Sequence, residues 1–439
     1  MLRTLVAAAS CLMLVVTGCT GSGTEPAPTP TGPPVYRGPE LPRLITEEIP
    51  VDPNLAVRSV DRQVTRLNEN TLVLGGGGAF SVIDLRTGAE QWNGRDLPET
   101  FTLPEIGRVS LFTTDGWATA DDRGGLLVEQ YYQDPCPGDA GCTADRATLT
   151  EGKGLLAFSA VDRRLLWSAP VLPPVPRDSV GAKGRNNIFP SIVGASRDVV
   201  VVNIGGDPPH GTGYGPTDGT PRVTMGFDPA TGEKLWEIPG VLTQKLVDGL
   251  ALGVATPDDG GTLPTPLALD ARTGRERWRL SEPGRWQDAT AGIALLDRAD
   301  RNLTNPLQPR PVALPGGELG PELGQRSFVG LGTDLDGIPF ASWVSNAPTG
   351  STYAMWSQRL SDPQPLHGPG QLDDLRFVHG VTNGYLWVGA GSRETRVTAL
   401  DRSGTERSDA LPGFPRYIDN DIVVTDGTGA VRIWRHRPA

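Results

Sequence analysis

With 439 residues, the chain is too long for one ordinary core, so it must form two or three domains, a barrel or an array of repeats. Its 56 Gly and 41 Pro residues are too frequent for long helices and favour many short strands joined by turns. The net charge of −11, in a sequence without a clustered basic run, argues against nucleic acid as a partner.

Residues 1–18 have the pattern of a lipoprotein signal peptide. A short basic start is followed by an apolar stretch from Leu5 to Val16. The tetrapeptide that ends at Cys19 resembles the bacterial lipobox, whose Cys is acylated, for example with palmitate, and begins the mature protein. The alternative is an ordinary secretory signal that happens to contain a Cys. We expect a lipid on Cys19 to hold the protein on the extracytoplasmic face of the cell membrane without a spanning helix.

The segment after the acylated residue is too polar to pack a core. Residues 20–43 are rich in Pro, Gly and Thr and contain few large apolar side chains. Such a segment forms a semi-extended tether, with a reach of about 70 Å if it is fully polyproline-like. We therefore expect the lipidated Cys and tether to occupy residues 19–43 and the folded domain to occupy residues 44–439.

One motif, Asp-x-x-Thr-Gly-x-x-x-Trp, recurs along the folded part. Its full copies consist of Asp84, Thr87, Gly88 and Trp92; of Asp228, Thr231, Gly232 and Trp236; and of Asp270, Thr273, Gly274 and Trp278. Two degenerate copies keep Trp167 after Ser159, and Asp401 with Gly404. The Asp accepts hydrogen bonds from nearby amides, the Gly takes a positive φ, and the chain reverses. The Trp then lies on the returning strand, where its ring covers a neighbouring layer.

These repeats predict an all-β protein, a β-propeller of about eight four-stranded blades, with a count of seven left open. Strands such as residues 199–202 are apolar on both faces, as in sheets covered from both sides. Segments that we interpret as blades begin near Leu67, Val109, Val193, Val247, Ala291, Phe328, Phe377 and Tyr417. The last blade is incomplete, and we expect a strand within residues 55–60 to complete it and close the ring. A two-sheet sandwich with a separate domain is the alternative fold.

Between these copies, Cys136 and Cys142 are separated by five turn-forming residues. Outside the cytoplasm such a pair predicts a local disulfide, worth about 2 kcal/mol on the chain-entropy model. Metal binding is the alternative, although no His lies nearby in the sequence.

The motif, preceded by an apolar strand, resembles the repeat of the quinoprotein, or PQQ-like, propellers, which include PQQ alcohol dehydrogenases and the BamB-like lipoproteins. The resemblance covers most of residues 60–435 and is strong in three units. The resemblance is a specific indicator of the fold and a weak indicator of function, because the same propeller occurs in enzymes, scaffolds and sensor domains.

In the enzymes that the resemblance includes, a quinone stacks on a disulfide between adjacent Cys residues and a calcium ion is bound. This chain has no adjacent Cys pair, and its four His form no metal-binding pair. The Gly run at 75–78 lies between two strand patterns and predicts a turn, and the acidic pairs near residues 121, 258 and 334 also predict turns. We therefore assign no catalytic residue, no cofactor and no metal ligand.

Two long inserts, residues 205–222 and 303–324, are candidates for recognition, because loops on a rigid scaffold usually carry it. We expect a noncatalytic binding or scaffold module for an envelope protein or a cell-wall ligand. The alternative is an enzyme with its active site at the mouth of the propeller channel.

Overall fold

The computed structural model describes residues 40–439 except for 61–62, 77–78, 105, 120–123, 134–148, 177, 179–187, 189, 206–221, 256–263, 299–308, 321, 323–327, 334–337, 347–352, 360–369, 373–375, 391–395, 402 and 428–429. The chain divides into two units, Met1–Pro33 and Pro34–Ala439, and every described residue belongs to the second. Within the described part, no helix is long and apolar enough to cross a bilayer.

The strands form sheets that follow one another along the chain, numbered here in that order. Sheet 1 contains β2 (Val64–Asn68), β3 (Thr71–Gly76), β4 (Ala79–Asp84) and β5 (Glu90–Asn93), and a 3-10 turn, η1 (Gly94–Asp96), follows it. Sheet 2 contains β6 (Thr100–Leu103), β7 (Gly107–Thr119), β8 (Leu126–Gln133), β9 (Gly152–Ser159) and β10 (Leu165–Leu172). Sheet 3 contains β11 (Ser191–Ala195), β12 (Val200–Ile204), β13 (Val223–Phe227) and β14 (Lys234–Pro239). Sheet 4 contains β15 (Val241–Val247), β16 (Leu250–Ala255), β17 (Thr265–Asp270) and β18 (Glu276–Arg279).

The second half of the chain continues the pattern. Sheet 5 contains β19 (Gly284–Thr290), β20 (Ile293–Arg298) and β21 (Arg310–Ala313). Sheet 6 contains β22 (Phe328–Thr333), β23 (Pro339–Asn346), β24 (Tyr353–Arg359) and β25 (Gly370–Leu372). Sheet 7 contains β26 (Arg376–Thr382), β27 (Tyr385–Ala390), β28 (Arg396–Leu400) and β29 (Leu411–Pro412). Sheet 8 contains β30 (Phe414–Ile418), β31 (Ile422–Gly427) and β32 (Ala430–Pro438) together with β1 (Leu44–Ile49).

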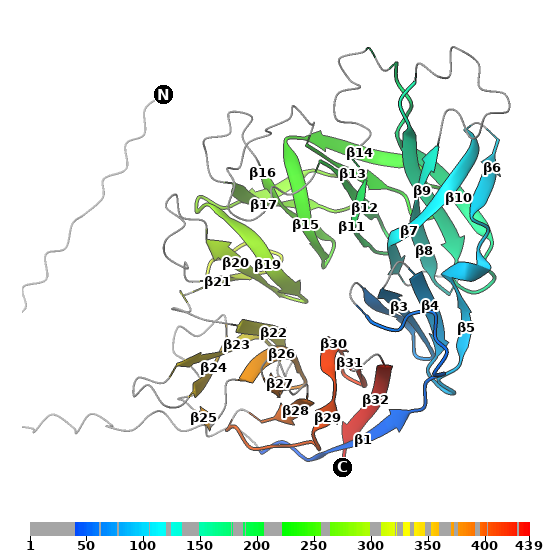
Figure 1. The fold of residues 1–439 in the computed structure, drawn as a ribbon. Helices are drawn as coiled ribbons and strands as arrows, with labels where there is room; N and C mark the ends of the chain where they lie inside the picture. The colour runs from blue at the N-terminus through cyan, green and yellow to red at the C-terminus, as the bar shows by residue number, and fades with distance from the viewer. Residues whose placement is uncertain are drawn as a thin grey trace, which may run out of the picture. The chain divides into compact units, whose positions relative to one another are not determined.

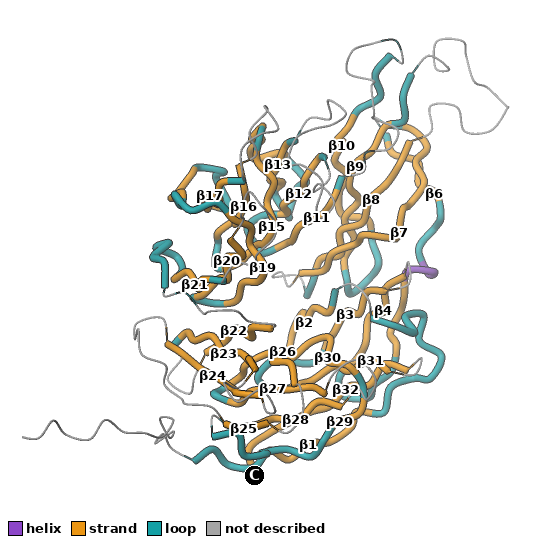
Figure 2. Tube along the Cα trace, turned by 60° about the vertical axis from the view of Figure 1, so that its left-hand side comes forward, coloured by secondary structure: helices purple, strands orange, loops and turns teal. Residues whose placement is uncertain are grey.

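The sheets are the blades of a ring. We call β2, β7, β11, β15, β19, β22, β26 and β30 the first strands of the blades, because β6 is an extra strand that pairs with β7 and has no equivalent among the described strands of the other sheets. Figure 1 shows β11, β15 and β19 around the centre of the ring. Neighbouring first strands contact one another, as β7 does β11, β11 does β15, and β15 does β19. Figure 2 shows the same ring from another side, built almost entirely of strands. Among the described residues, seven sheets have four or five strands and sheet 5 has three. The predicted all-β propeller of about eight blades, with seven left open, is confirmed.

The ring closes through a different strand from the expected one. β1 pairs antiparallel with β32 from Leu44 opposite Pro438 to Ile49 opposite Ile433, so the prediction of a closing strand within residues 55–60 is wrong. Residues 55–60 are irregular and supply Leu55, Val57 and Val60 to the core between sheets 8 and 1. Their apolar side chains are needed inside this core, whereas β1 is buried only at its end residues, Leu44 and Ile49, and its middle residues face solvent, as in an outer strand.

The repeated motif forms a hairpin between the third and fourth strands of a sheet. In sheet 4 the Asp270 N–H donates to the carbonyl of Arg275, and the Gly274 N–H donates to the Asp270 carbonyl, each at 2.8 Å. Asp270 Oδ1 accepts from the Thr273 N–H at 2.9 Å. Gly274 has a φ of 69°, in the left-handed region that glycine favours. The same turn bond joins Gly88 to Asp84, Gly232 to Asp228 and Gly404 to Asp401.

Two further sheets build this hairpin without the complete motif. In sheet 2, Arg163 takes the glycine position with a φ of 63° and donates its N–H to the Ser159 carbonyl at 3.0 Å. In sheet 5, Gly317 donates to the Ala313 carbonyl at 2.8 Å, although the sequence analysis found no copy there. The backbone pattern therefore does not require the Asp side chain.

The tryptophans join each sheet to the next. Each indole N–H donates to a backbone carbonyl in the hairpin of the following sheet: Trp92 to Ala160 (2.7 Å), Trp167 to Pro229 (2.8 Å), Trp236 to Ala271 (2.9 Å) and Trp278 to Pro315 (2.6 Å). A large ring thus packs over the neighbouring hairpin, as the motif predicts.

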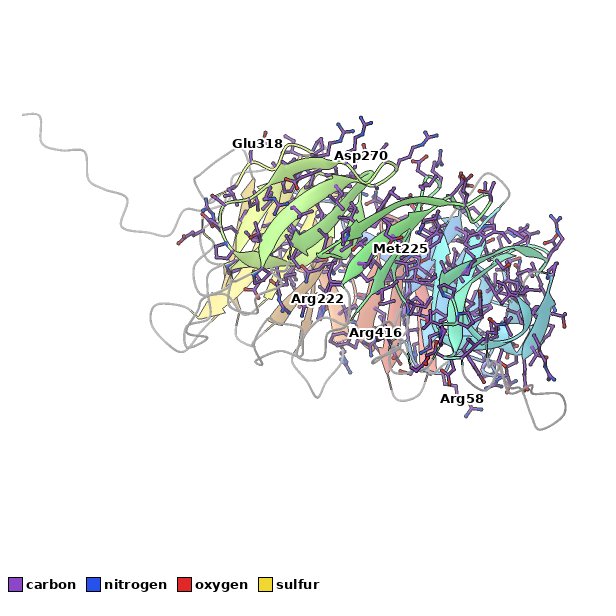
Figure 3. All side chains as sticks on the ribbon, turned by 90° about the horizontal axis from the view of Figure 1, so that it is seen from above. Arg58, Arg222, Met225, Asp270, Glu318 and Arg416 are labelled. Carbon is purple, nitrogen blue, oxygen red and sulfur yellow. The ribbon has the colours of Figure 1, made fainter. Side chains whose placement is uncertain are left out.

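The hairpins define the two ends of the ring. We call the end that holds the hairpins the hairpin end and the opposite end the insert end. The second strands of sheets 3 and 5, β12 and β20, run away from the hairpins, and residues 206–221 and 299–308 follow them in the sequence. Figure 3 shows Asp270 and Glu318 at the hairpin end and Arg222 and Arg416 at the insert end.

Candidate functional site

A cavity of about 800 Å³ lies along the first strands of sheets 3, 4 and 5. Figure 1 shows these strands, β11, β15 and β19, as neighbours around the centre of the ring. The lining consists of Trp117, Ser191, Ile192, Val193, Asn203, Gly205, Leu242, Thr243, Gln244, Lys245, Leu246, Arg285, Trp286, Gln287, Asp288, Ala289 and Asp297. Its volume falls in the range typical of small-molecule sites, and it mixes apolar walls with a few polar groups.

β-Bulges shape this wall. The pairing of β15 with β16 skips from Thr243 to Lys245, and the pairing of β19 with β20 skips from Trp286 to Asp288. Gln244 and Gln287 are thus the extra residues of two equivalent bulges. Because a bulge turns the side chains that follow it, Lys245 and Asp288 occupy equivalent places on neighbouring strands and both line the cavity.

Lys245 and Asp288 form a long ion pair across the cavity wall. Nζ of Lys245 lies 4.0 Å from Oδ1 of Asp288, and the side chains are 37% and 53% exposed. Burial within the ring raises the pKa of Asp288, and the neighbouring lysine opposes this rise. A pair of this length with this exposure contributes little stability.

Asn203 of β12 fixes the wall between sheets 3 and 4. Its amide nitrogen donates to the Thr243 carbonyl at 2.7 Å, and its Oδ1 accepts from the Thr243 N–H at 3.1 Å. The hydroxyl of Thr224 donates to the same oxygen at 2.8 Å. This side chain is therefore held in one orientation by both sheets.

Gln244 fixes the wall between sheets 4 and 5 in a similar way. Its Oε1 accepts from the Trp286 N–H at 2.8 Å. The indole N–H of Trp286 donates to the Gly253 carbonyl at 3.0 Å, so the ring is tied to β16. The cavity wall is consequently preorganised by hydrogen bonds between adjacent sheets.

A second group of side chains lies where sheets 7 and 8 meet. His379, the bulge residue of β26, packs edge-on against Phe414 at 4.8 Å between ring centroids. The guanidinium of Arg416 lies 5.0 Å from the centroid of the same ring and 3.4 Å from Asp426. Burial lowers the pKa of His379 to about 4, so its imidazole is neutral at neutral pH.

A third group joins the first and last sheets at the hairpin end. Arg66 of β2 contacts Asp421 at 2.7 Å and Asp419 at 3.2 Å, in the turn after β30. The Tyr417 hydroxyl donates to Asp419 at 3.1 Å, and a ring nitrogen of His436 lies 2.9 Å from the carbonyl of Asp419. These contacts tie the two ends of the ring together.

The residues singled out in the sequence lie in different places. The motif residues, including Asp84, Trp167 and Asp401, are at the hairpins and are not brought into the cavity. Cys19, Cys136 and Cys142, with their expected lipid and disulfide, lie outside the described residues.

Residues 206–221 of the first long insert, residues 303–308, 321 and 323–324 of the second, and the acidic pairs lie outside the described residues. The interpretation of 303–324 as a recognition loop is wrong for residues 310–317, which form β21 and the hairpin of sheet 5. Gly205, the last described residue before 206–221, lines the cavity, as does Asp297 shortly before 299–308. Among the described residues, no group of three or more His, Cys, Asp or Glu side chains is arranged to hold a metal ion.

The sequence analysis missed the cavity residues. A usable signal is the repetition of a Gln followed by a charged residue inside two otherwise apolar first strands, Gln244 with Lys245 and Gln287 with Asp288. Polar residues at matching positions of successive blades indicate side chains that face a shared channel.

No family model matches the chain, and no curated protein matches its sequence. Several solved structures are similar to it. BamB from Moraxella catarrhalis is 14% identical, with a TM-score of 0.47 over 90% of this chain and 100% of that one. The WD40 domain of SCAP from fission yeast is 11% identical, with a TM-score of 0.44 over 90% and 98%. Quinohemoprotein alcohol dehydrogenase from Comamonas testosteroni is 11% identical, with a TM-score of 0.41 over 90% and 76%.

What these structures share with the chain is the fold. The resemblance to PQQ-like, BamB-like propellers holds at that level, and within this chain the hairpins and the tryptophan contacts between sheets carry it.

Proposed function

We propose that this chain is a lipid-anchored extracytoplasmic protein whose propeller binds an envelope component without catalysis. In this proposal residues 1–18 are removed, Cys19 carries the lipid, and the tether leads from it to the propeller at residues 44–439. The partner is a cell-wall ligand or a protein segment that enters the channel cavity.

The cavity is the observation that carries the binding role. Sheets 2, 3, 4 and 5 contribute to it, and Asn203 and Gln244 are already held by hydrogen bonds between sheets 3, 4 and 5. A site whose polar groups are fixed before the ligand arrives loses less entropy on binding, which favours affinity. Because the lining includes Lys245 and Asp288 as well as apolar walls, it suits a polar ligand.

The anchor is supported by the sequence and by the place where the chain enters the propeller. Arg43 accepts a backbone hydrogen bond from Ala439 at 2.8 Å, and the Leu44 N–H donates to the Arg407 carbonyl at 2.6 Å. The described chain therefore starts at the hairpin end, whereas the cavity lining reaches the insert end at Gly205.

The binding role is tested by photo-crosslinking in intact cells. A photoreactive amino acid at Gln287, which is exposed in the cavity, is expected to form an adduct with an envelope protein or a glycan. The same group at Arg272, exposed on the hairpin of sheet 4, is the matched control and should form none. Adducts that are the same from both positions, or absent from both, would contradict a binding site in the channel.

The anchor has its own test. Replacing Cys19→Ser should abolish incorporation of labelled palmitate and release the protein from the membrane fraction, because the lipid is the proposed attachment. Retention of the variant in the membrane fraction, with labelling unchanged, would contradict the anchor and leave the binding role intact.

A further inference from the structure

We propose that the channel cavity recognises a carboxylate-bearing sugar, and that Lys245 is the residue that pairs with the carboxylate. This inference rests on the proposed binding role and adds the chemical class of the ligand. It is argued from the charge of the channel wall, the partners of the charged lining residues and the polar groups left exposed in the cavity.

The charged side chains of the cavity are two cations, Lys245 and Arg285, and two carboxylates, Asp288 and Asp297. On other strands around the ring, Arg66 is paired with Asp419 and Asp421, and Arg416 with Asp426, so these cations add no net positive charge to the cavity. The ligand charge that the cavity accepts therefore depends on which of its own charged side chains lacks a close partner.

Lys245 is the cation of the lining that is available to a ligand. Arg285 and Asp297 both have partners of their own. Lys245 has the 4.0 Å contact with Asp288, which is longer than a charge-assisted hydrogen bond. A ligand carboxylate that approached to about 2.8 Å would be a better partner for the ammonium group.

The character of Asp288 supports the same conclusion. Burial raises the pKa of its carboxyl group, so its charged form is less favoured than that of an ordinary Asp. The Oδ1 atom that faces Lys245 already accepts a hydrogen bond from the Ala289 N–H at 2.9 Å, so Asp288 keeps a close partner when Lys245 pairs with a ligand.

The remaining lining suits a sugar. The exposed amide of Gln287 and the hydroxyl of Ser191 offer donors and acceptors for ligand hydroxyls. Trp117 adds an aromatic surface to the same cavity. The volume of about 800 Å³ accommodates a small ligand of this kind.

The test compares two sugars that differ by a carboxylate. N-acetylmuramic acid carries a lactyl carboxylate, and N-acetylglucosamine has the same ring and acetamido group without it. Binding of each to the full lipidated protein in detergent micelles is measured by calorimetry at low salt. We expect N-acetylmuramic acid to bind about tenfold more tightly or better, and this preference to shrink as salt is added.

Variants connect the preference to the proposed residue. Lys245→Gln should remove the preference, Lys245→Arg should keep most of it, and Arg272→Gln, an exposed cation on the hairpin, should leave it unchanged. Thermal unfolding of each variant is measured alongside, and the Arg variant keeps the test decisive if the Gln variant is unstable.

The outcomes separate this inference from the proposed function. Equal affinities for the two sugars, a preference that survives in Lys245→Gln, or no binding of either sugar would overturn the inference. The photo-crosslinking experiment at Gln287 tests the binding role independently. An adduct at Gln287, together with equal affinities for the two sugars, would contradict the proposed ligand class and leave the binding role intact.

Discussion

Glycine is favoured at hairpin positions such as Gly274 for two separable reasons. Gly274 has a φ of 69°, and a Cβ on it would lie 2.8 Å from ring atoms of Trp236. Gly249, in the preceding turn of the same sheet, has a φ of 72°, but a Cβ there would meet nothing within 4 Å. The two positions therefore share the backbone strain and differ in the contact with the tryptophan.

This pair allows the two costs to be measured separately. Gly249→Ala should destabilise the protein by about 1 kcal/mol, the cost of a left-handed conformation for a residue with a side chain. Gly274→Ala should cost more than that by about 1 to 3 kcal/mol, because the tryptophan ring must also move. Urea unfolding of both variants provides the comparison, and equal losses would show that the ring has room to shift.

His379 links the stability of the fold to pH. Burial lowers its pKa to about 4, below the ordinary value of about 6.5. Between these values the unfolded chain binds a proton at this residue that the folded chain does not bind, so stability falls as the pH is lowered from about 6.5 to about 4.

The corresponding variant should weaken this dependence. In His379→Gln, the urea midpoint is expected to fall less steeply over the same pH window, because no imidazole is available to titrate. Some slope should remain, since burial also lowers the pKa of His436. An unchanged slope would mean that His379 titrates normally in the folded protein.

At the scale of elements, the tryptophan on the fourth strand is the main contact from one sheet to the next hairpin. Trp236 is 8% exposed, and its indole N–H donates to Ala271. Trp236→Ala should cost about 3 to 5 kcal/mol, as for other large buried aromatic residues. Trp236→Phe keeps an aromatic ring and loses the hydrogen bond, so about 1 to 2 kcal/mol is expected. If the Ala variant unfolds at the wild-type urea concentration, the contact does not hold the sheets together.

Sequence patterns predict these elements well because each depends on residues close together in the chain. The Asp and Gly of a hairpin are four positions apart, so the turns at Gly88, Gly232 and Gly274 could be identified. The hairpin at Gly317 was missed because Ala313 stands in the Asp position, and only the backbone bonds reveal it.

Features that depend on several sheets could not be predicted in the same way. The closing strand was misplaced because residues 55–60 are more apolar than β1, and sequence alone does not distinguish an outer strand from an irregular segment in a core. The cavity depends on bulges at Gln244 and Gln287, whose register is set by pairing with the next strand. Nothing local to either residue shows that both face one channel.

At the scale of the whole molecule, the ring is closed by contacts between the two ends of the chain. β1 provides the fourth strand of sheet 8, and Leu44 and Ile49 are buried. Sheets 1 to 4 each contact the next hairpin through a tryptophan. Between sheets 8 and 1, Arg435 instead donates to the Leu85 carbonyl at 3.3 Å. Arg66 adds its ion pairs to the turn after β30. Closure therefore depends on β1 and on polar contacts more than on a large aromatic ring.

Removing β1 should open the ring. A chain that begins at Pro50 loses the burial of Leu44 and Ile49, which costs about 3 to 6 kcal/mol at about 1.5 to 3 kcal/mol for each side chain. It also leaves β32 with an unpaired edge, which favours pairing between copies. A chain that begins at Glu40 keeps β1 and is the matched control, expected to be monomeric and as stable as the full chain. Urea unfolding and size-exclusion chromatography with light scattering distinguish the two, and a chain from Pro50 that is monomeric and fully stable would show that the propeller does not need this strand for closure.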